Sequence, residues 1–269
     1  MKLDPGTILP KISFGREVCG DLSAADQREW LVTNGVGGYA CGSVSGILNR
    51  RYHGLLVAAL VPPGDRTLLL SHLDETADYD GRSYQLFTNR WSAGEVNPTG
   101  YQLLERFTLE GTVPVWVYAF QDALLEKRIW MEQGANTTYI RYTLLRGSAV
   151  SLSVKALVNH RSHHGRQGDW QPAITCIPNC LHVGEDMYLI GEGEAAETVP
   201  ASAWYRGYFL TRESYRGLDP RVEHFGVDRI GDRLQVVGGV HGERPRSRIP
   251  GHVERRVVGN LAALARVGE

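Results

Sequence analysis

The sequence is poor in cysteine and has no excess of either charge. Four cysteines in 269 residues are too sparse for the disulfide framework of a small secreted domain. The 29 basic residues nearly balance the 30 acidic ones, whereas a dedicated nucleic-acid-binding protein usually has a strong basic excess. We therefore expect buried thiols and a partner other than nucleic acid.

Long apolar runs are also missing. No segment approaches the ~20 apolar residues that a helix needs to cross a bilayer. The first residues, Met1 to Gly20, lack the basic and then apolar pattern of a signal peptide. The sequence predicts a cytoplasmic protein without a membrane partner.

No convincing metal-ligand motif is present. Cys176 and Cys180 form the only close cysteine pair, but their spacing is wide for a zinc knuckle. No second Cys/His pair lies beyond them at the spacing of a zinc finger. We expect neither a metal nor a cofactor.

What the sequence does have is a series of short apolar runs separated by turn residues. These runs are rich in Val, Leu, Tyr, Trp and Thr, which suit a pleated, half-buried surface. Asp80-Gly81, Glu110-Gly111 and Arg146-Gly147 are expected as tight turns between them. Strands are expected at 52–60, 67–73, 101–110, 113–121, 124–131, 137–145 and 150–158. Strands without alternating helices predict an all-β fold, namely a large antiparallel sandwich of two sheets.

The last part of the chain has a different composition. After Phe225 there are eight arginines and no aromatic residue. Val253, Val257, Leu261 and Leu264 fall on one helical face, which predicts a short C-terminal helix. We therefore expect a β-sandwich domain over 1–224 and a linker with a short helix over 225–269.

A glycine-rich stretch follows the first apolar run. Residues 35–40, GVGGYA, match the dinucleotide fingerprint in form. That fingerprint needs a helix directly after the glycines and an acidic residue about 20 positions later, and both are missing here. We interpret Asn34 and Gly35 as a hairpin-type turn, with Gly37 and Gly38 allowing close backbone approach or positive φ.

The glycines are followed by Arg50-Arg51-Tyr52-His53. Such a cluster can be a solvated strand edge, but Arg, Tyr and His also offer directional donors and a planar ring for a hydroxyl-rich ligand. The apolar residues 55–57 would anchor this cluster on a buried strand. Arg51, Tyr52 and His53 are therefore candidate site residues.

Several segments together resemble a known family. Residues 29–40, EWLVTNGVGGYA, and 50–58, RRYHGLLVA, look like the opening of the N-terminal domain of bacterial and archaeal glycogen debranching enzymes of the amylo-α-1,6-glucosidase type. Residues 157–164, LVNHRSHH, resemble that family's Asn-Tyr-Arg-x-x-His stretch, with His160 in place of the usual tyrosine. Residues 204–206, with Glu213 and the segment 216–219, resemble the end of the domain.

The resemblance implies a fold, a partner and a function. The fold would be a supersandwich like that of galactose mutarotase, followed in the family by an (α/α) toroid that holds the catalytic carboxylates. Residues 225–269 do not match a toroid, so no catalytic residue is expected in this chain. The expected function is α-glucan or oligosaccharide binding beside a catalytic toroid domain or protein. Asn159, Arg161 and His164 join Arg51, Tyr52 and His53 as residues expected to contact sugar or to brace the domain interface.

Three other interpretations compete with glucan binding. Asp74, Glu75, Asp78 and Asp80 are the densest acidic group, and we expect them in a solvated turn rather than in the paired geometry of a glycosidase. A stand-alone mutarotase-like sugar isomerase could use His160, His163 and His164 for proton transfer. A cupin-like metal site on the same histidines lacks its His-x-His pattern.

Overall fold

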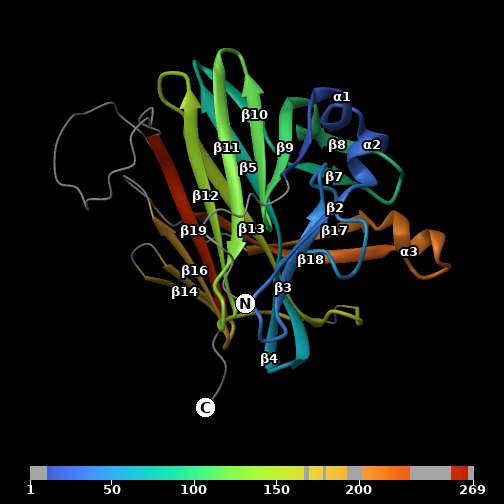
Figure 1. Cartoon of the computed structure of the whole chain (residues 1–269). Helices are drawn as coiled ribbons and strands as arrows, with labels where there is room; N and C mark the ends of the chain where they lie inside the picture. Colours follow the sequence, from blue (N-terminus) through green and yellow to red (C-terminus); the bar gives the residue numbers. More distant parts are fainter. Residues whose placement is uncertain (1–10, 167–169, 178–179, 193–201, 231–255, 266–269) are drawn as a thin grey trace, which may run out of the picture.

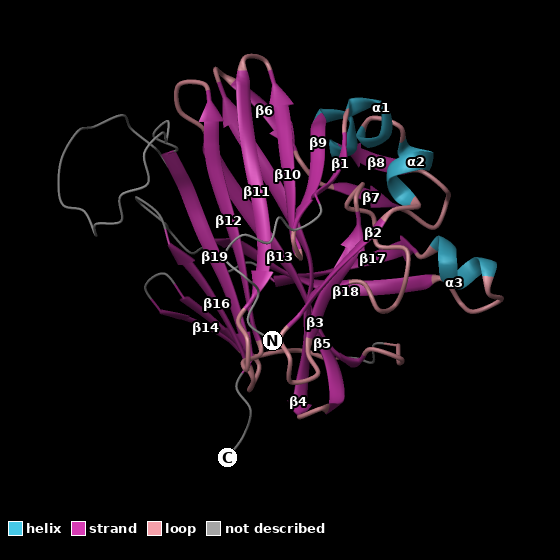
Figure 2. Cartoon of the chain, viewed as in Figure 1, coloured by secondary structure: helices cyan, strands magenta, loops and turns pink. Residues whose placement is uncertain are grey.

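The computed structural model describes residues 11–166, 170–177, 180–192, 202–230 and 256–265. Within these ranges the chain forms two large antiparallel sheets, one small sheet and three short α-helices (Figures 1 and 2). The expected all-β, two-sheet fold is confirmed. No described helix is both long and apolar enough to span a membrane.

The first large sheet has nine strands in the order β1-β9-β10-β11-β12-β19-β16-β15-β14. Their bounds are β1 Lys11–Phe14, β9 Leu104–Glu110, β10 Val113–Phe120, β11 Ala123–Met131, β12 Thr137–Arg146, β14 Ile174–Ile177, β15 Cys180–Val183, β16 Met187–Glu192 and β19 Arg256–Ala265.

The second large sheet has the order β17-β18-β13-β5-β4-β3-β2, with β6 paired to β5. Its strands are β2 Glu29–Thr33, β3 Tyr39–Ser43, β4 Gly54–Val61, β5 Gly64–Tyr79, β6 Arg82–Gln85, β13 Ser151–Ser162, β17 Ser202–Phe209 and β18 Arg221–Ile230.

The remaining elements pack against both large sheets: α1 contacts β9 of the first sheet, and β7 contacts β17 of the second. They are helices α1 Arg16–Cys19, α2 Leu22–Asp26 and α3 Thr211–Tyr215, strands β7 Thr88–Arg90 and β8 Val96–Thr99, and the 3-10 turn η1 Gly100–Leu103. Trp91 forms an isolated bridge to Tyr208, which ties the small β7-β8 sheet to β17.

The seven strands expected from the apolar runs correspond to β4, β5 and β9 to β13. The expected C-terminal helix is wrong. Residues 256–265 form β19, which pairs with β12 on one side and β16 on the other. Strand β19 lies inside the nine-stranded sheet, between β12 and β16. Its backbone groups therefore form hydrogen bonds with two neighbouring strands instead of the bonds within a helix. Residues 231–255, including Val253, lie outside the described part.

The acidic group is also placed differently from the expectation. Strand β5 continues to Tyr79, so Asp74 and Glu75 lie inside a 16-residue strand rather than in a turn. Both side chains are buried. Asp78 and Asp80 are exposed near its end, and only Asp80 reaches the turn.

One large core fills the space between the sheets. Trp30 of β2 meets Trp116 of β10 edge-on, with ring centroids 5.3 Å apart. A second, smaller cluster contains Leu157, Tyr208, Leu210 and Val222. Because Leu157 lies between Ala156 and Val158 of the main core, its side chain is on the opposite face of β13. The part of the eight-stranded sheet around β13, β17 and β18 is therefore covered on both faces. We call the face away from the nine-stranded sheet the outer face.

Candidate functional site

The glycine-rich stretch forms the connection between β2 and β3. The Asn34 side chain is buried, and its amide donates to the carbonyl of Ala135 and to Asn136 Oδ1, both at 3.0 Å. Gly37 has φ +106°, and a Cβ there would lie 2.4 Å from the carbonyl oxygen of Pro63. A Cβ at Gly38 would lie 2.5 Å from the side-chain nitrogen of Asn34. The stretch thus allows close backbone contact and leads into a strand, so it has no helix N-terminus for a phosphate.

The candidate residues 51–53 lie in the loop before β4. His53 is 2% exposed. Its Nδ1 accepts a hydrogen bond from the Asn49 backbone N–H at 3.1 Å, so Nε2 carries the proton and faces Glu29 Oε1 at 3.3 Å. This hydrogen bond, with that of Arg50, lowers the pKa of Glu29 to about 2. The His53 side chain therefore holds the loop and does not reach the surface.

Arg51 connects the loop to α3 and the segment after it. Its backbone N–H donates to Glu213 Oε1 at 3.1 Å, and its Nη2 donates to the Asp219 carbonyl at 3.0 Å. The Glu213 side chain is 1% exposed. The loop is thus braced by residues more than 160 positions later in the chain.

From β13, Arg161 supports the same loop, whereas Asn159 binds the neighbouring strand β18. Arg161 Nη2 donates to the Arg51 carbonyl at 2.8 Å, and its Nη1 donates to the carbonyls of Ser162 and Gly165. Burial lowers the pKa of Arg161 to about 10. Asn159 is fully buried and donates to the Glu223 carbonyl at 3.0 Å. Both side chains therefore bind backbone within the fold.

Tyr52 lies at the centre of an aromatic group that reaches the surface. Its hydroxyl shares a hydrogen bond of 3.1 Å with Nδ1 of the exposed His164. Its ring meets the His163 and His164 rings edge-on, at 5.3 and 5.5 Å between centroids. Tyr39 adds a hydroxyl 2.9 Å from His163 Nδ1. We call Tyr39, Tyr52, His163 and His164 the Tyr52 cluster.

The histidines named for the isomerase reading do not form one group. His160 Nε2 lies 3.3 Å from Asp186 Oδ2, and its ring packs on Trp170. His163 and His164 belong to the Tyr52 cluster. Burial lowers the pKa of His163 to about 4, so this imidazole is neutral near pH 7. The structure therefore divides the candidate bases between two places.

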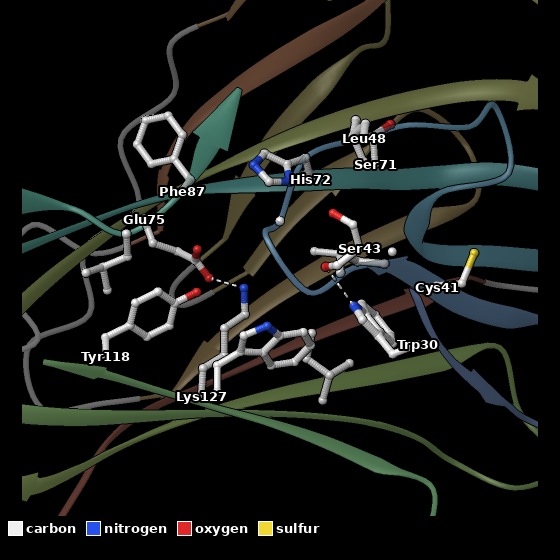
Figure 3. A pocket seen from close by; sticks show the side chains of 16 residues that line it. Trp30, Cys41, Ser43, Leu48, Ser71, His72, Glu75, Phe87, Tyr118 and Lys127 are labelled. Carbon is white, nitrogen blue, oxygen red and sulfur yellow. Dashed lines mark hydrogen bonds and ion pairs between the residues drawn. The ribbon is translucent and has the colours of Figure 1, made fainter. Parts of the chain in front are cut away.

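A small cavity lies between the two sheets (Figure 3). Its volume is about 40 Å³, enough for only a few water molecules. Figure 3 shows Lys127, Glu75 and Tyr118 pointing toward one another in it. Lys127 Nζ lies 2.5 Å from Glu75 Oε1, and the Tyr142 hydroxyl donates to the same oxygen at 2.5 Å.

The four cysteines are all free. Burial raises the pKa of Cys19 to about 11 and that of Cys41 to about 12, which keeps both thiols protonated and unreactive. Within the described ranges, no group of three or more His, Cys, Asp or Glu side chains could hold a metal ion.

Sequence reasoning missed the residues that brace the Tyr52 cluster. Glu213 and Asp219 were visible only as part of a segment that resembles the end of the family domain, with no role attached. Tyr39 lay inside the glycine-rich stretch and was counted there with the turn. Covariation between positions 51 and 213 in related sequences would have revealed this contact, but a single sequence contains no covariation.

Comparison with known proteins identifies the family. The family model described as glycogen debranching enzyme N terminal matches residues 28–234. None of the curated proteins compared with the chain matches it. The matched range contains the whole Tyr52 cluster, its braces and the inter-sheet cavity. Since it covers well over half of the sequence, the chain belongs to the glycogen debranching enzyme N-terminal domain family.

Proposed function

We propose that this chain is the α-glucan-binding accessory domain of a glycogen debranching enzyme, and that it helps shape the substrate cleft of an α-1,6-glucosidase in glycogen breakdown. Its partners would be an α-glucan or oligosaccharide and a catalytic (α/α) toroid, either as a domain or as a separate protein. The chain itself would contribute binding, and the catalytic carboxylates would belong to the toroid.

The observation that carries this proposal is the Tyr52 cluster at the surface of a domain from this family. Tyr52 is half-buried and His164 is exposed, so a phenol and an imidazole are accessible. The loop beneath them is held by Arg51, Arg161 and Glu213. A rigid platform reduces the conformational entropy lost on binding, which favours recognition of a flexible sugar chain.

The geometry divides the six sequence candidates into two roles. Tyr52 and His164 would touch a ligand or a neighbouring domain, because both side chains are accessible. His53, Asn159 and Arg161 are buried. His53 and Arg161 would act by holding the backbone of residues 49–53, and Asn159 by binding the Glu223 carbonyl of β18. Arg51 is half-buried and would act through its contacts with Glu213 and Asp219.

Native gel electrophoresis in glycogen tests the proposal. The unmodified chain should be retarded by glycogen, and the double variant Tyr52→Ala/His164→Ala should be retarded less. Tyr215→Ala is the matched control, because this α3 tyrosine is 90% exposed and lies outside the cluster. An unretarded native chain, or glucose release from branched limit dextrin by the chain alone, would contradict the proposed role.

The isomerase alternative has one structural point in its favour, the contact between His160 and Asp186. A carboxylate beside an imidazole is a common arrangement for proton transfer. Acceleration of glucose anomer equilibration by the chain, lost in His160→Ala, would support this alternative over the binding role.

A further inference from the structure

A second hollow lies on the outer face, where the small β7-β8 sheet meets β17. Its volume is about 450 Å³, within the range of roughly 300–1,000 Å³ typical of ligand pockets. We call it the Trp91 groove. It is lined by Asp74, Phe87, Asn89, Trp91, Glu95, Asn97, Pro98, Tyr205 and Tyr208. It shares no residue with the Tyr52 cluster.

The aromatic wall of the groove is held in place. Trp91 is half-buried, and its indole N–H donates to the Asn97 carbonyl at 2.7 Å. Its ring packs against Tyr208 at 4.7 Å between centroids. The indole thus keeps a partly accessible ring in a fixed orientation, which suits stacking against the apolar face of a ligand.

Tyr205 forms the other part of this wall. Its ring lies over Gly226 of β18, where an added Cβ would be 2.3 Å from the ring carbon Cε2. Its hydroxyl accepts a hydrogen bond from Lys155 Nζ at 2.8 Å. Gly226 is therefore the position at which a single methyl group would displace the Tyr205 ring.

Polar groups line the same groove. Asp74 and Asn89 are 9% and 4% exposed, and both contribute to its surface. Tyr208 is 2% exposed, and within the described residues its hydroxyl has no hydrogen-bond partner. Buried hydroxyls in proteins are nearly always hydrogen-bonded, so this groove-lining hydroxyl indicates a polar partner from outside the described chain.

We propose that the Trp91 groove binds a pyranose unit of an α-glucan, with its apolar face on the Trp91 ring and its hydroxyls toward Asp74, Asn89 and Tyr208. Aromatic rings combined with carboxylate, amide and phenol groups match the alternating C–H and O–H surface of a pyranose. A neutral ligand also suits a wall that contains the carboxylates of Asp74 and Glu95. The assignment of glucose units rests on the proposed function, whereas the preference for a pyranose rests on the groove.

Calorimetric titration with maltoheptaose tests the groove. Trp91→Ala should weaken binding at least tenfold. Trp130→Ala is the matched control, because Trp130 is also half-buried and also packs on one tyrosine, Tyr139 at 5.4 Å, but it lies on β11 of the other sheet. Gly226→Ala should weaken binding as well, by moving Tyr205 while leaving Trp91 in place. Equal affinity of Trp91→Ala and the native chain would overturn the proposal.

A measurement on the unmodified chain covers the case in which Trp91→Ala fails to fold. Maltoheptaose should slow the oxidation of Trp91 by N-bromosuccinimide, read by peptide mass spectrometry, and leave that of Trp130 unchanged. Equal oxidation of Trp91 with and without the sugar would count against the groove.

The outcomes separate the groove from the proposed function. If the native chain binds maltoheptaose and Trp91→Ala leaves the affinity unchanged, the proposal for the groove is wrong and the proposed function stands. If the native chain does not bind maltoheptaose but binds cellohexaose through Trp91, the groove binds a pyranose and the proposed α-glucan function is wrong. If neither sugar binds, both are contradicted.

Discussion

Two buried glutamates illustrate how differently the two sides of the eight-stranded sheet are built. Glu75 lies between the sheets, and its side chain is 2% exposed. Glu213 lies against the loop that contains Arg51, and its side chain is 1% exposed. Glu75 meets an ammonium group and a phenol, whereas Glu213 accepts from the backbone N–H of Arg51. The first carboxylate is neutralised within the core, and the second holds a surface loop in position.

The two hollows of the molecule also differ between these sides of the sheet. The inter-sheet cavity has a volume of about 40 Å³ and the Trp91 groove one of about 450 Å³. Charged groups alone therefore do not mark a binding site in this fold. The larger hollow, on the outer face, combines partly accessible aromatic rings with polar side chains.

The largest effect is expected from breaking the inner pair. Glu75→Gln leaves the buried Lys127 ammonium without its counter-charge, which typically costs about 3–5 kcal/mol of unfolding free energy. Urea denaturation measures this loss. Glu110→Gln is the control, because the Glu110 side chain is 41% exposed and Arg128 keeps its second partner, Glu126. Exposed ion pairs contribute about 0–1 kcal/mol. The double variant Glu75→Gln/Lys127→Met should recover part of the loss, and a single variant as stable as the native chain would show that the pair is not needed.

A smaller effect on stability, but a clear local one, is expected at Glu213. Glu213→Ala removes a charged acceptor from the Arg51 backbone N–H, which should cost about 2 kcal/mol. Because the loop then loses its brace, trypsin should cleave faster after Arg50 and Arg51, and this is readily followed by mass spectrometry. Glu105→Ala is the control, since Glu105 is 48% exposed and its partner Arg16 is exposed as well. Unchanged cleavage rates would mean that Arg161 alone holds the loop.

The smallest effect is expected from acidification. Burial lowers the pKa of His72 to about 3, while an unfolded histidine titrates near 6.5. The unfolded state therefore takes up a proton between these values that the folded state does not, so stability is complete above pH 6.5 and falls as the pH drops toward 3. At pH 5.5 the loss is about 1 kcal/mol for this histidine.

The pH effect can be assigned by comparing slopes. His72→Gln should flatten the dependence of the urea midpoint on pH between 6.5 and 5.5. His160→Gln should leave the slope as it is in the native chain, because the His160 side chain is 40% exposed. Identical slopes for His72→Gln and the native chain would show that other groups cause the acid sensitivity.

The sequence predicted the regular part of the fold well. Short apolar runs separated by turn residues located β4, β5 and β9 to β13, because a buried strand is a short apolar segment bounded by turn residues. The C-terminal helix was predicted wrongly, since Val257, Leu261 and Leu264 repeat at a helical spacing but lie in a strand between two neighbours. Periodicity over so short a stretch does not distinguish a helix from a strand whose pairing is decided elsewhere.

The sequence grouped two distant segments as one candidate site, and the structure brings these segments into contact. Residues 51–53 and 159–164 do lie together, because Arg161 donates to the Arg51 carbonyl. The sequence could not tell that His53 and Asn159 are buried while Tyr52 and His164 reach the surface. It also passed over Trp91, Tyr205 and Tyr208, since six tryptophans and twelve tyrosines in a β-rich chain are expected mainly in the core.

By itself, the sequence determined the all-β class, most of the strands in the middle of the chain and, through residues 29–58, the resemblance to the debranching enzyme family. Those features depend on local patterns, which a chain contains whether or not it is folded. Only the tertiary structure decided the rest: that Glu75 is paired in the core, that Glu213 braces a loop 162 residues away, and that Trp91 and Tyr208 line one groove. These depend on which strands become neighbours, and neighbours distant in the chain are selected by packing rather than by local sequence.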